Sequence, residues 1–387
     1  MQMRVRKRTY GHEPIRARYR FMIRPKEDEP TAVTFIGALP PPVTGMTAMT
    51  QVIVEALCQG GPVRCFNWSR GRHLSGLKWK MARVSGACLS FVKIILGRRR
   101  PREVVYYPVS SGWGLLYDIA ILGAARLRGY RVFVHHHVYS YINRRDWRMV
   151  FLTRMLGPDS VHVVHCEQMK HDFLNQYSTN AKFLFVPPTI VASDAYPLTT
   201  PPHERFTLGL LSNLSLAKGL DSAIDTYTAL ANAGRNVALI LAGPCQGSTE
   251  RRLIDHVVSK WPDRVEYRGP VYNAAKDRFF ADIDVFLFPT RYNNESWGIV
   301  LNEALAASRP VISGRRGCVP WIVQDGCGIV VDDPRDFVPQ ACRSIIRWMD
   351  DEQEFARIRE RAGCRAKSLT QEAERQFAYF LSRIRSL

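Results

Sequence analysis

The chain has 387 residues, more than one ordinary core accommodates, and this length predicts two domains of about 150–190 residues each. Hydrophobic residues make up 46% and charged residues 23%, as in globular proteins, and the net charge of +19 suits an anionic membrane surface, nucleic acid, a phosphorylated substrate or simple solubility. Nine scattered cysteines, none spaced Cys-x-x-Cys, argue against a disulfide framework and a structural zinc site and favour the reducing cytoplasm.

A basic tail begins the chain. Residues 1–30 hold nine Lys and Arg residues and no apolar segment follows them, so a secretory signal is not predicted. We expect this tail to be disordered and able to hold a peripheral protein on an anionic membrane, since each such cation contributes about 1 kcal/mol near anionic lipid. No stretch reaches the roughly 18 uncharged apolar residues of a membrane span. Val84–Gly97 and Gly114–Arg126 come closest, and both are short and contain a charged residue.

The first half alternates β-branched runs with helical stretches, which is typical of parallel βαβ units. Expected strands are Ala32–Ile36, Val104–Tyr107, Arg131–His135, Ser160–His165 and Lys182–Val186. Expected helices between them are Met46–Leu57, Leu115–Leu127 and Met149–Leu156. This pattern predicts a Rossmann-like domain over residues 31–190.

A stretch rich in Pro and Thr then predicts an interdomain linker over residues 191–205. Expected strands of the second half are Phe206–Leu211, Ala238–Ala242, Val265–Tyr267, Val285–Phe288 and Val311–Ile312. Expected helices are Gly219–Ala233, Ser248–Lys260, Asn273–Ala281, Val300–Ala307 and Asp336–Trp348. We predict a second Rossmann-like domain over residues 206–350 and charged helices over residues 351–387. The fold class is α/β, with two lobes facing each other across a cleft and ligands at the carboxyl ends of the strands.

The densest chemical signal is a strand, a polar loop and a helix in the second domain. The loop carries Glu295, and the helix begins near Gly298, which puts Glu303 on its second turn. Gly298 lets the backbone approach a ligand, and the free amides of Gly298, Ile299 and Val300 would form an anion site at the positive end of the helix. The two carboxylates, eight positions apart, could flank a ligand that is phosphate at one point and polyhydroxyl at another.

This segment resembles the Glu–seven residues–Glu motif of glycosyltransferase family 4. The resemblance includes the preceding strand, which ends in Pro-Thr, and the following Ala-(x)4-Arg-Pro-Val-Ile segment. It implies a GT-B enzyme that retains anomeric configuration. It also implies that Glu303 hydrogen-bonds the ribose hydroxyls of the nucleotide and that Glu295 lies beside the donor sugar. The structural alternative is that Glu295 is a solvated loop residue and Glu303 lies on a solvated helix face.

A second segment follows the first strand of the second domain and opens a helix. A lysine at such a helix start, here Lys218, is well placed to neutralise a leaving diphosphate. The segment resembles the family's Gly-Arg-Leu-(x)3-Lys-Gly stretch, in which Lys218 matches the phosphate-binding lysine. Ser212 and Asn213 stand where the family has glycine and a second cation, so Asn213 could donate one hydrogen bond but no charge. The alternative for Lys218 is a solvated lysine on a first helical turn.

The first domain, which the resemblance implies binds the acceptor, contributes two candidates. Gly45 joins the first strand to the first helix, and its loop resembles the family's N-terminal loop with one glycine instead of a pair; a purely structural glycine is the alternative. Three adjacent histidines, residues 135–137, end a strand. Because strand neighbours point to opposite faces, only His135 and His137 could converge, and no nearby Asp, Glu or Cys completes a metal site. In the family a histidine here faces the donor sugar; we choose His137 and expect His135 to be packed.

Smaller pieces complete the resemblance. Val271 ends a segment matching one whose backbone cradles the base in related enzymes. Asp282 and Asp284 could be mistaken for the metal-binding Asp-x-Asp of the other glycosyltransferase fold, but they fit a helix end and a strand start. Trp321 stands where the family has a glutamate after proline.

The prediction is a retaining, metal-independent hexosyltransferase without a cofactor, located in the cytoplasm or peripherally on the inner membrane face. It would move a sugar from a UDP- or GDP-linked donor to a glycan or lipid-linked acceptor in polysaccharide or cell-envelope biosynthesis. Glu295, His137 and Lys218 are its expected catalytic residues. The expected donor-binding residues are Glu303, Asn213, Gly298, Ile299, Val300, Val271 and Gly45.

Three rival functions remain on the sequence alone. Another GT-B enzyme, such as an epimerase or a phosphorylase, would keep the two lobes but should lack the Glu295/Glu303 pair or carry a lysine for pyridoxal phosphate. A nucleic-acid-binding protein would suit the charge of +19, but it should show a basic stripe with interleaved aromatics, and the tail is the one candidate that we identify for such a stripe. A dehydrogenase fits poorly, because no Gly-x-Gly-x-x-Gly follows either first strand.

Overall fold

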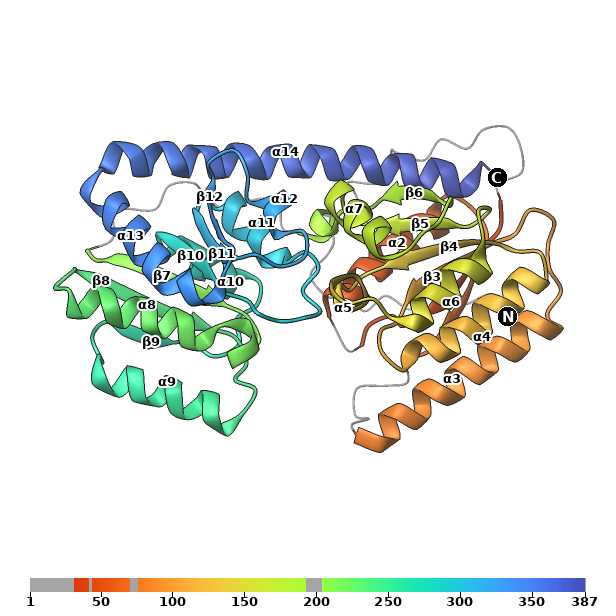
Figure 1. Cartoon of the computed structure of the whole chain (residues 1–387), viewed down its shortest axis with the longest axis horizontal. Helices are drawn as coiled ribbons and strands as arrows, with labels where there is room; N and C mark the ends of the chain where they lie inside the picture. Colours follow the sequence, from red (N-terminus) through yellow and green to blue (C-terminus); the bar gives the residue numbers. More distant parts are fainter. Residues whose placement is uncertain (1–30, 42–43, 70–75, 193–203, 387) are drawn as a thin grey trace.

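The computed structural model describes residues 31–41, 44–69, 76–192 and 204–386. Within them, two six-stranded sheets, each parallel throughout, form two lobes flanked by helices (Figure 1). The predicted α/β class with two Rossmann-like lobes is confirmed. The basic tail predicted for residues 1–30 and most of the predicted linker, residues 193–203, lie outside the described residues.

The N-terminal sheet has the strand order β2-β1-β3-β4-β5-β6. Its strands are β1 (Val33–Gly37), β2 (Val63–Asn67), β3 (Val104–Val109), β4 (Arg131–His136), β5 (Val161–Val164) and β6 (Lys182–Phe185). Its helices are α2 (Gly45–Gln59), α3 (Gly76–Leu96), α4 (Gly114–Leu127), α5 (Ser140–Asn143), α6 (Trp147–Leu156), α7 (Glu167–Gln176) and the short η1 (Pro188–Val191). Sequence patterning missed β2, because this edge strand has no fully buried residue and includes Arg64 and Asn67.

The C-terminal sheet has the strand order β12-β11-β10-β7-β8-β9. Its strands are β7 (Phe206–Leu211), β8 (Val237–Ala242), β9 (Val265–Tyr267), β10 (Val285–Phe288), β11 (Val311–Gly314) and β12 (Gly328–Val331). Its helices are η2 (Leu216–Lys218), α8 (Leu220–Asn232), α9 (Ser248–Lys260), α10 (Ala274–Ala281), α11 (Ile299–Ala306), α12 (Val319–Ile322), η3 (Pro334–Asp336) and α13 (Phe337–Asp350). The unpredicted β12 is again an edge strand, with one fully buried residue.

Helices on both faces explain why the central strands are continuous apolar runs. Every residue of β3 and of β10 is buried, as expected for parallel strands covered on both sides. The charge that interrupts α4, Asp118, is fully buried and accepts hydrogen bonds from the Tyr107 hydroxyl at 2.6 Å and the Ser110 amide at 2.7 Å. It therefore ties α4 to the end of β3. Among the described helices, none combines the length and hydrophobicity that crossing a bilayer requires.

The C-terminal segment is one continuous helix, α14 (Glu352–Arg385), where several helices were expected over residues 351–387. At 34 residues it is about 50 Å long, and it runs along both lobes (Figure 1). It packs on α11 of the C-terminal lobe and on η1 and β6 of the N-terminal lobe. Phe380 is fully buried, with its ring centroid 5.9 Å from that of Tyr106 and 6.4 Å from that of Phe133. The end of the chain thus completes the core of the first lobe.

Replacing Phe380 tests this contribution. We expect Phe380→Ala to lower the free energy of unfolding by about 3–5 kcal/mol, because it removes a buried ring and leaves a cavity. The neighbouring Tyr379 is 53% exposed, so Tyr379→Ala should change stability by less than about 0.5 kcal/mol. Urea denaturation of both variants measures the difference, and equal effects would mean that the helix end contributes little to the first lobe.

Candidate active site

A cavity of about 440 Å³ lies between the lobes. Its walls come from segments that follow β4, β5, β7, β8 and β10 and from the N-terminal ends of α2 and α11, so it sits at the carboxyl ends of the strands, as in other parallel sheets. All ten residues singled out from the sequence line it. They are Gly45, His137, Asn213, Lys218, Val271, Glu295, Gly298, Ile299, Val300 and Glu303. The structure brings them together; their roles stay predictions.

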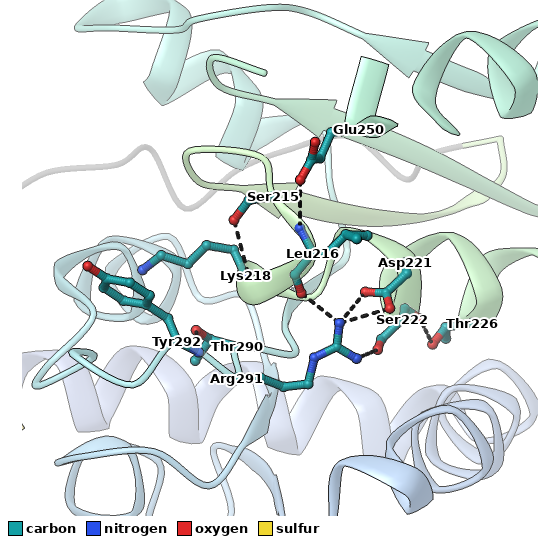
Figure 2. Close-up of polar contacts among 10 residues, drawn as sticks. All are labelled: Ser215, Leu216, Lys218, Asp221, Ser222, Thr226, Glu250, Thr290, Arg291 and Tyr292. Atoms are coloured by element: carbon teal, nitrogen blue, oxygen red, sulfur yellow. Dashed lines mark hydrogen bonds and ion pairs between the residues drawn. The ribbon is translucent and has the colours of Figure 1, made fainter. Parts of the chain in front are cut away.

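Glu295 forms a buried ion pair with Lys218 at the cavity wall. The Lys218 Nζ lies 2.5 Å from the Glu295 Oε2, and the glutamate is 8% exposed. The Thr290 hydroxyl donates to the same carboxylate at 3.3 Å. The lysine ammonium also lies 4.6 Å from the centre of the Tyr292 ring, toward which it points (Figure 2). Lys218 therefore has two partners, a carboxylate and an aromatic face, and any anion in the cavity would compete with both.

The turn that carries Lys218 is held by a residue that the sequence did not single out. Arg291 follows β10, and its Nη2 donates to the Leu216 carbonyl at 2.6 Å and to the Asp221 carboxylate at 2.7 Å (Figure 2). Gly219 has φ +80°, and a Cβ there would lie 2.3 Å from the Pro289 carbonyl oxygen, so this position requires glycine. Together these contacts fix η2 against the end of β10.

Glu303 forms the second buried ion pair of the cavity. Its Oε1 lies 2.5 Å from the Nζ of Lys276 on α10, and the glutamate is 6% exposed. Burial raises the pKa of Glu303, and the nearby Lys276 opposes that rise. Sequence reasoning missed Lys276, because nothing in the α10 sequence marks it as facing the next helix.

The N-terminus of α11 opens onto the cavity. Gly298 caps the helix with φ +72°, and a Cβ there would meet the Phe288 ring at 3.0 Å, so only glycine fits. The first amides of any helix have no acceptor within the helix, which leaves those of Ile299 and Val300 available to an anion. A Cβ on Gly45 would lie 3.4 Å from the Ile299 side chain, so the α2 and α11 N-termini approach each other across the cavity.

Histidines line the first lobe's side of the cavity. His137 and His165 both reach it, and the Nε2 of His137 is buried without a hydrogen-bond partner among the described residues. Burial, with the neighbouring His165, holds the pKa of His137 well below its usual range, so the imidazole is neutral. The His135 ring lies tilted against that of His137, with ring centres 3.9 Å apart, and its Nδ1 pairs with the Tyr106 hydroxyl at 2.6 Å. His135 is packed and does not line the cavity.

The remaining predicted features fall as follows. His136 points to the other face of the strand, where its Nε2 contacts the His162 Nδ1 at 2.8 Å. Within the described part of the chain, no group of three or more His, Cys, Asp or Glu side chains could hold a metal ion. Asp282 pairs with Arg268 at 2.7 Å, and Asp284 accepts from the Thr207 amide at 2.8 Å, so this Asp-x-Asp holds the lobe together. Cavity residues that sequence reasoning missed include Lys276, His165, Trp297 and Tyr272.

The cavity contains two carboxylates, each in an ion pair with a lysine. Each is nearly buried and is neutralised by a lysine that another ligand could attract, while a helix N-terminus and a neutral imidazole add hydrogen-bond donors and acceptors. Such a site suits a ligand that combines phosphate with hydroxyl groups. Asn213 also lines the cavity but adds no charge.

Comparison with known proteins gives a family match in the second lobe. Residues 199–365 match the family model described as "Glycosyl transferases group 1", a range that contains Lys218, Glu295 and Glu303. A GDP-mannose-dependent alpha-(1-6)-phosphatidylinositol monomannoside mannosyltransferase of Mycobacterium tuberculosis is 32% identical over 165 residues, which are 41% of this chain and 40% of that protein. The GDP-mannose-dependent monoacylated alpha-(1-6)-phosphatidylinositol monomannoside mannosyltransferase of Corynebacterium glutamicum is 31% identical over 148 residues, 36% of this chain and 37% of that protein. The match thus spans about two fifths of each relative's length.

Solved structures match over both lobes. A sucrose-phosphate synthase from Thermosynechococcus elongatus superimposes with a TM-score of 0.67 at 14% identity and covers 92% of this chain and 98% of its own. Anabaena HepE in complex with UDP-glucose gives 0.62 at 16% identity, with 91% and 99% covered. At such identities the likeness establishes the fold, which is the two-lobed GT-B fold.

The buried histidines predict how stability depends on pH. Burial lowers the pKa of all five, for His162 and His165 to about 4 and for His135, His136 and His137 well below the usual 6.5. Below pH 6.5 the unfolded chain therefore binds protons that the folded chain does not, and stability falls. Between pH 7 and 5.5 each histidine should remove about 1 kcal/mol from the free energy of unfolding.

Urea denaturation across this pH range measures the effect. His162→Gln keeps a hydrogen-bonding side chain toward His136 but does not titrate, so its loss of stability with falling pH should be smaller by the share of one histidine. Stability that stays constant, or rises, from pH 7 to 5.5 would contradict the prediction.

Proposed function

We propose that the chain is a retaining glycosyltransferase, because residues 199–365 match the family model of the group 1 glycosyl transferases and the chain has the GT-B fold. It transfers a sugar from a nucleotide-sugar donor to a glycan or lipid-linked acceptor in polysaccharide or cell-envelope biosynthesis. The observation that carries this proposal is the cavity in which Lys218, Glu295 and Glu303 meet the N-terminus of α11. The relatives use GDP-mannose, which makes it the first donor to test; UDP-sugars come next, because HepE binds UDP-glucose.

The nucleotide binds the second lobe in this proposal. Glu303 gives up its ion pair with Lys276 and accepts hydrogen bonds from two ribose hydroxyls, which the two oxygens of a carboxylate can do at once. The backbone at Val271 borders the base. The diphosphate lies between the α11 amides and Lys218, where an anion is favoured by both the helix end and the ammonium. Asn213 adds a neutral hydrogen bond beside it.

The transfer step then follows from charge. As the sugar–phosphate bond breaks, negative charge grows on the leaving diphosphate and positive charge on the anomeric carbon. Lys218 turns from Glu295 to the diphosphate and, with the α11 amides, stabilises it without a metal ion. The freed Glu295 carboxylate and the neutral His137 orient the sugar. The acceptor oxygen attacks from the side of the departing phosphate, and its proton passes to that phosphate, so the anomeric configuration is retained.

The first lobe holds the acceptor in this proposal. His137, His165 and Gly45 belong to the first lobe's side of the cavity, opposite the lysines and carboxylates of the second lobe. The basic tail of residues 1–30 supports a peripheral position on the cytoplasmic face of an anionic membrane, where lipid-linked acceptors are found.

A donor panel with two substitutions tests the function. Against GDP-, UDP- and ADP-sugars, Glu303→Gln should weaken donor binding at least about tenfold, because a neutral amide replaces the carboxylate. Lys218→Ala should lower turnover by about 10²–10³-fold, because the charge on the leaving group loses its cation. Titration calorimetry and donor hydrolysis measure the two effects, with Lys260→Ala at the exposed end of α9 as the control. If the unaltered protein binds no nucleotide-sugar, even with membranes present, the proposal fails.

Arg291 is expected to act as a positioning residue for Lys218. Arg291→Lys keeps the charge but cannot bridge the Leu216 carbonyl and Asp221 in the same way, so the turn should loosen. We expect kcat to fall about tenfold with little change in KM, because Lys218 acts mainly on the leaving group.

The control is another arginine that lies far from the cavity. Arg235→Lys alters an exposed ion pair with Asp350 and should leave both constants unchanged. If Arg291→Lys raises KM and leaves kcat unchanged, Arg291 serves donor binding and does not position Lys218 for the chemical step.

A further inference from the structure

The first lobe exposes an unusual concentration of large apolar side chains. Of the sixteen such side chains exposed among the described residues, eleven belong to α3, α4 and α6 or to the residue that precedes α4. The three helices are neighbours, since α4 packs against both α3 and α6 (Figure 1). We call this surface the α3–α4–α6 face. It consists of Met81, Val84, Leu89, Phe91, Val92, Leu96, Trp113, Leu116, Leu127, Trp147 and Phe151.

Helix α3 shows that this exposure is a stripe. Met81, Val84, Val92 and Leu96 recur at helical spacing on its solvent side, whereas Ala87, Ser90 and Ile94 are buried on the side toward the lobe. A surface helix normally pairs one apolar face with one polar face. Here the solvent side also exposes a row of apolar side chains beside polar residues such as Ser85 and Lys93, and apolar patches on a folded protein mark interaction sites.

Two indoles extend the stripe to the other helices. Trp113, just before α4, is 77% exposed, and Trp147, at the start of α6, is 66% exposed. The Arg148 guanidinium lies 5.0 Å from the centre of the first ring and 5.9 Å from the second, so it holds both indoles together. An indole pair with an arginine is amphipathic, with apolar rings and polar N–H and guanidinium groups at one place.

Positive charge predominates around the face, where the exposed Asp159 after α6 pairs with Arg126 of α4, and exposed negative charge is missing from the three helices. Neither α3 nor α6 contains Asp or Glu, and the one acidic residue of α4, Asp118, is buried. Between Glu55 and Glu103 the sequence has eleven Lys and Arg residues and no acidic one. Exposed cations of the described residues at or beside the three helices are Lys93, Arg98, Arg99, Arg100, Arg128, Arg144, Arg145 and Arg154.

We propose that the α3–α4–α6 face docks on an anionic lipid bilayer. Exposed aliphatic side chains and indoles enter the boundary between headgroups and acyl chains, and the surrounding arginines contact anionic headgroups. Charge complementarity between the arginines and anionic headgroups favours a bilayer over a second copy of the chain. In a symmetric dimer through this face, the same arginines would meet one another, which opposes association of two copies. A tail alone would need no apolar stripe on folded helices.

The place of the face also fits the reaction, a step that rests on the proposed function. Helices α4 and α6 begin after the carboxyl ends of β3 and β4, and the same edge of the sheet supplies His137 to the cavity. Trp113 and Trp147 stand at these helix starts. A bilayer under the face would therefore lie near the first lobe's side of the cavity, where a lipid-linked acceptor is expected to enter.

Vesicle binding by the full-length chain tests the docking face. Co-sedimentation would use phosphatidylcholine vesicles with and without about 30 mol% phosphatidylglycerol, at about 0.1 M and about 0.5 M salt. We expect binding to the anionic vesicles, with a decrease of about tenfold for Val84→Ser/Val92→Ser/Leu96→Ser and for Trp113→Ser/Trp147→Ser. Replacing the same three aliphatic residues of α3 by leucine or isoleucine should retain binding. Arg98→Gln/Arg99→Gln/Arg100→Gln should remove most of the preference for anionic lipid.

Two controls separate docking by this face from binding through the tail or through apolar residues elsewhere on the surface. Leu174→Ser/Tyr379→Ser removes apolar side chains that are 38% and 53% exposed outside the face, and should leave vesicle binding unchanged. A full-length variant with Arg4, Arg6, Lys7 and Arg8 changed to Gln measures the share of the tail. The proposal is overturned if vesicle binding is unchanged in both the α3 triple-serine variant and the Trp113→Ser/Trp147→Ser variant and is lost only in the tail variant. A solution dimer that the α3 variant dissociates also overturns it.

Donor binding in solution keeps the two proposals distinct. The apolar variants should bind nucleotide-sugar as the unaltered protein does, because no substituted residue lines the cavity. If they bind donor normally but lose vesicles, the docking face stands. If the unaltered protein binds vesicles through this face but no nucleotide-sugar, the proposed function fails and the docking face stands. If it binds donor but no vesicles, the docking face fails alone.

Discussion

The structure depends on a single helix that belongs to both lobes. α14 is continuous over 34 residues, and two of its arginines, one near its middle and one at its C-terminal end, donate hydrogen bonds to backbone carbonyls of the two lobes. Arg365 donates to Ile322 in the second lobe at 3.1 Å, and Arg385 donates to Thr31 and Leu57 in the first. The cavity is made of loops from two separate sheets, so its shape is set by how these sheets are held. α14 is a long helix that contacts both lobes, and it is the element that fixes the distance between the two sheets.

The charged groups of the cavity are held in two ion pairs, Lys218 with Glu295 and Lys276 with Glu303. Glu295 and Glu303 are each more than nine-tenths buried, and a buried carboxylate without a partner is strongly unfavourable, so each requires its lysine unless another group satisfies it. A ligand with phosphates and hydroxyls can replace both partners at once: phosphate attracts the lysine, and hydroxyl groups satisfy the carboxylate. A neutral ligand without phosphate could free neither lysine. The same pairing that stabilises the two carboxylates thus favours ligands of one chemical class.

How far the sequence predicts this molecule can be seen from particular elements. The alternation of β-branched runs and helices predicted ten of the strands. The pattern is clearest in central strands such as β3 and β10, which are buried on both faces and appear as continuous apolar runs, whereas the predicted edge strands β6 and β9 are partly exposed. The edge strands β2 and β12 escaped because partial exposure removes that pattern. Candidate residues were found where motifs are local, as for Glu295 and Glu303. Lys276, Arg291 and His165 were not, because their meaning comes from partners far away in sequence: Glu303 lies 27 positions from Lys276, and Asp221 lies 70 from Arg291.

The two lobes are subject to different physical constraints, which explains why sequence motifs identified more of the candidate site in the second lobe than in the first. In the proposed function the second lobe binds a compact, highly charged group, and only a few arrangements of helix end, lysine and carboxylate can do so, which makes its motifs short and easy to recognise. The first lobe combines neutral buried histidines with a broad apolar and basic outer face, and neither task needs a fixed spacing of residues. A surface that contacts lipid needs area, hydrophobicity and charge of one sign, and many sequences supply these. Such a face becomes visible only when the fold brings α3, α4 and α6 together and leaves their outer sides uncovered.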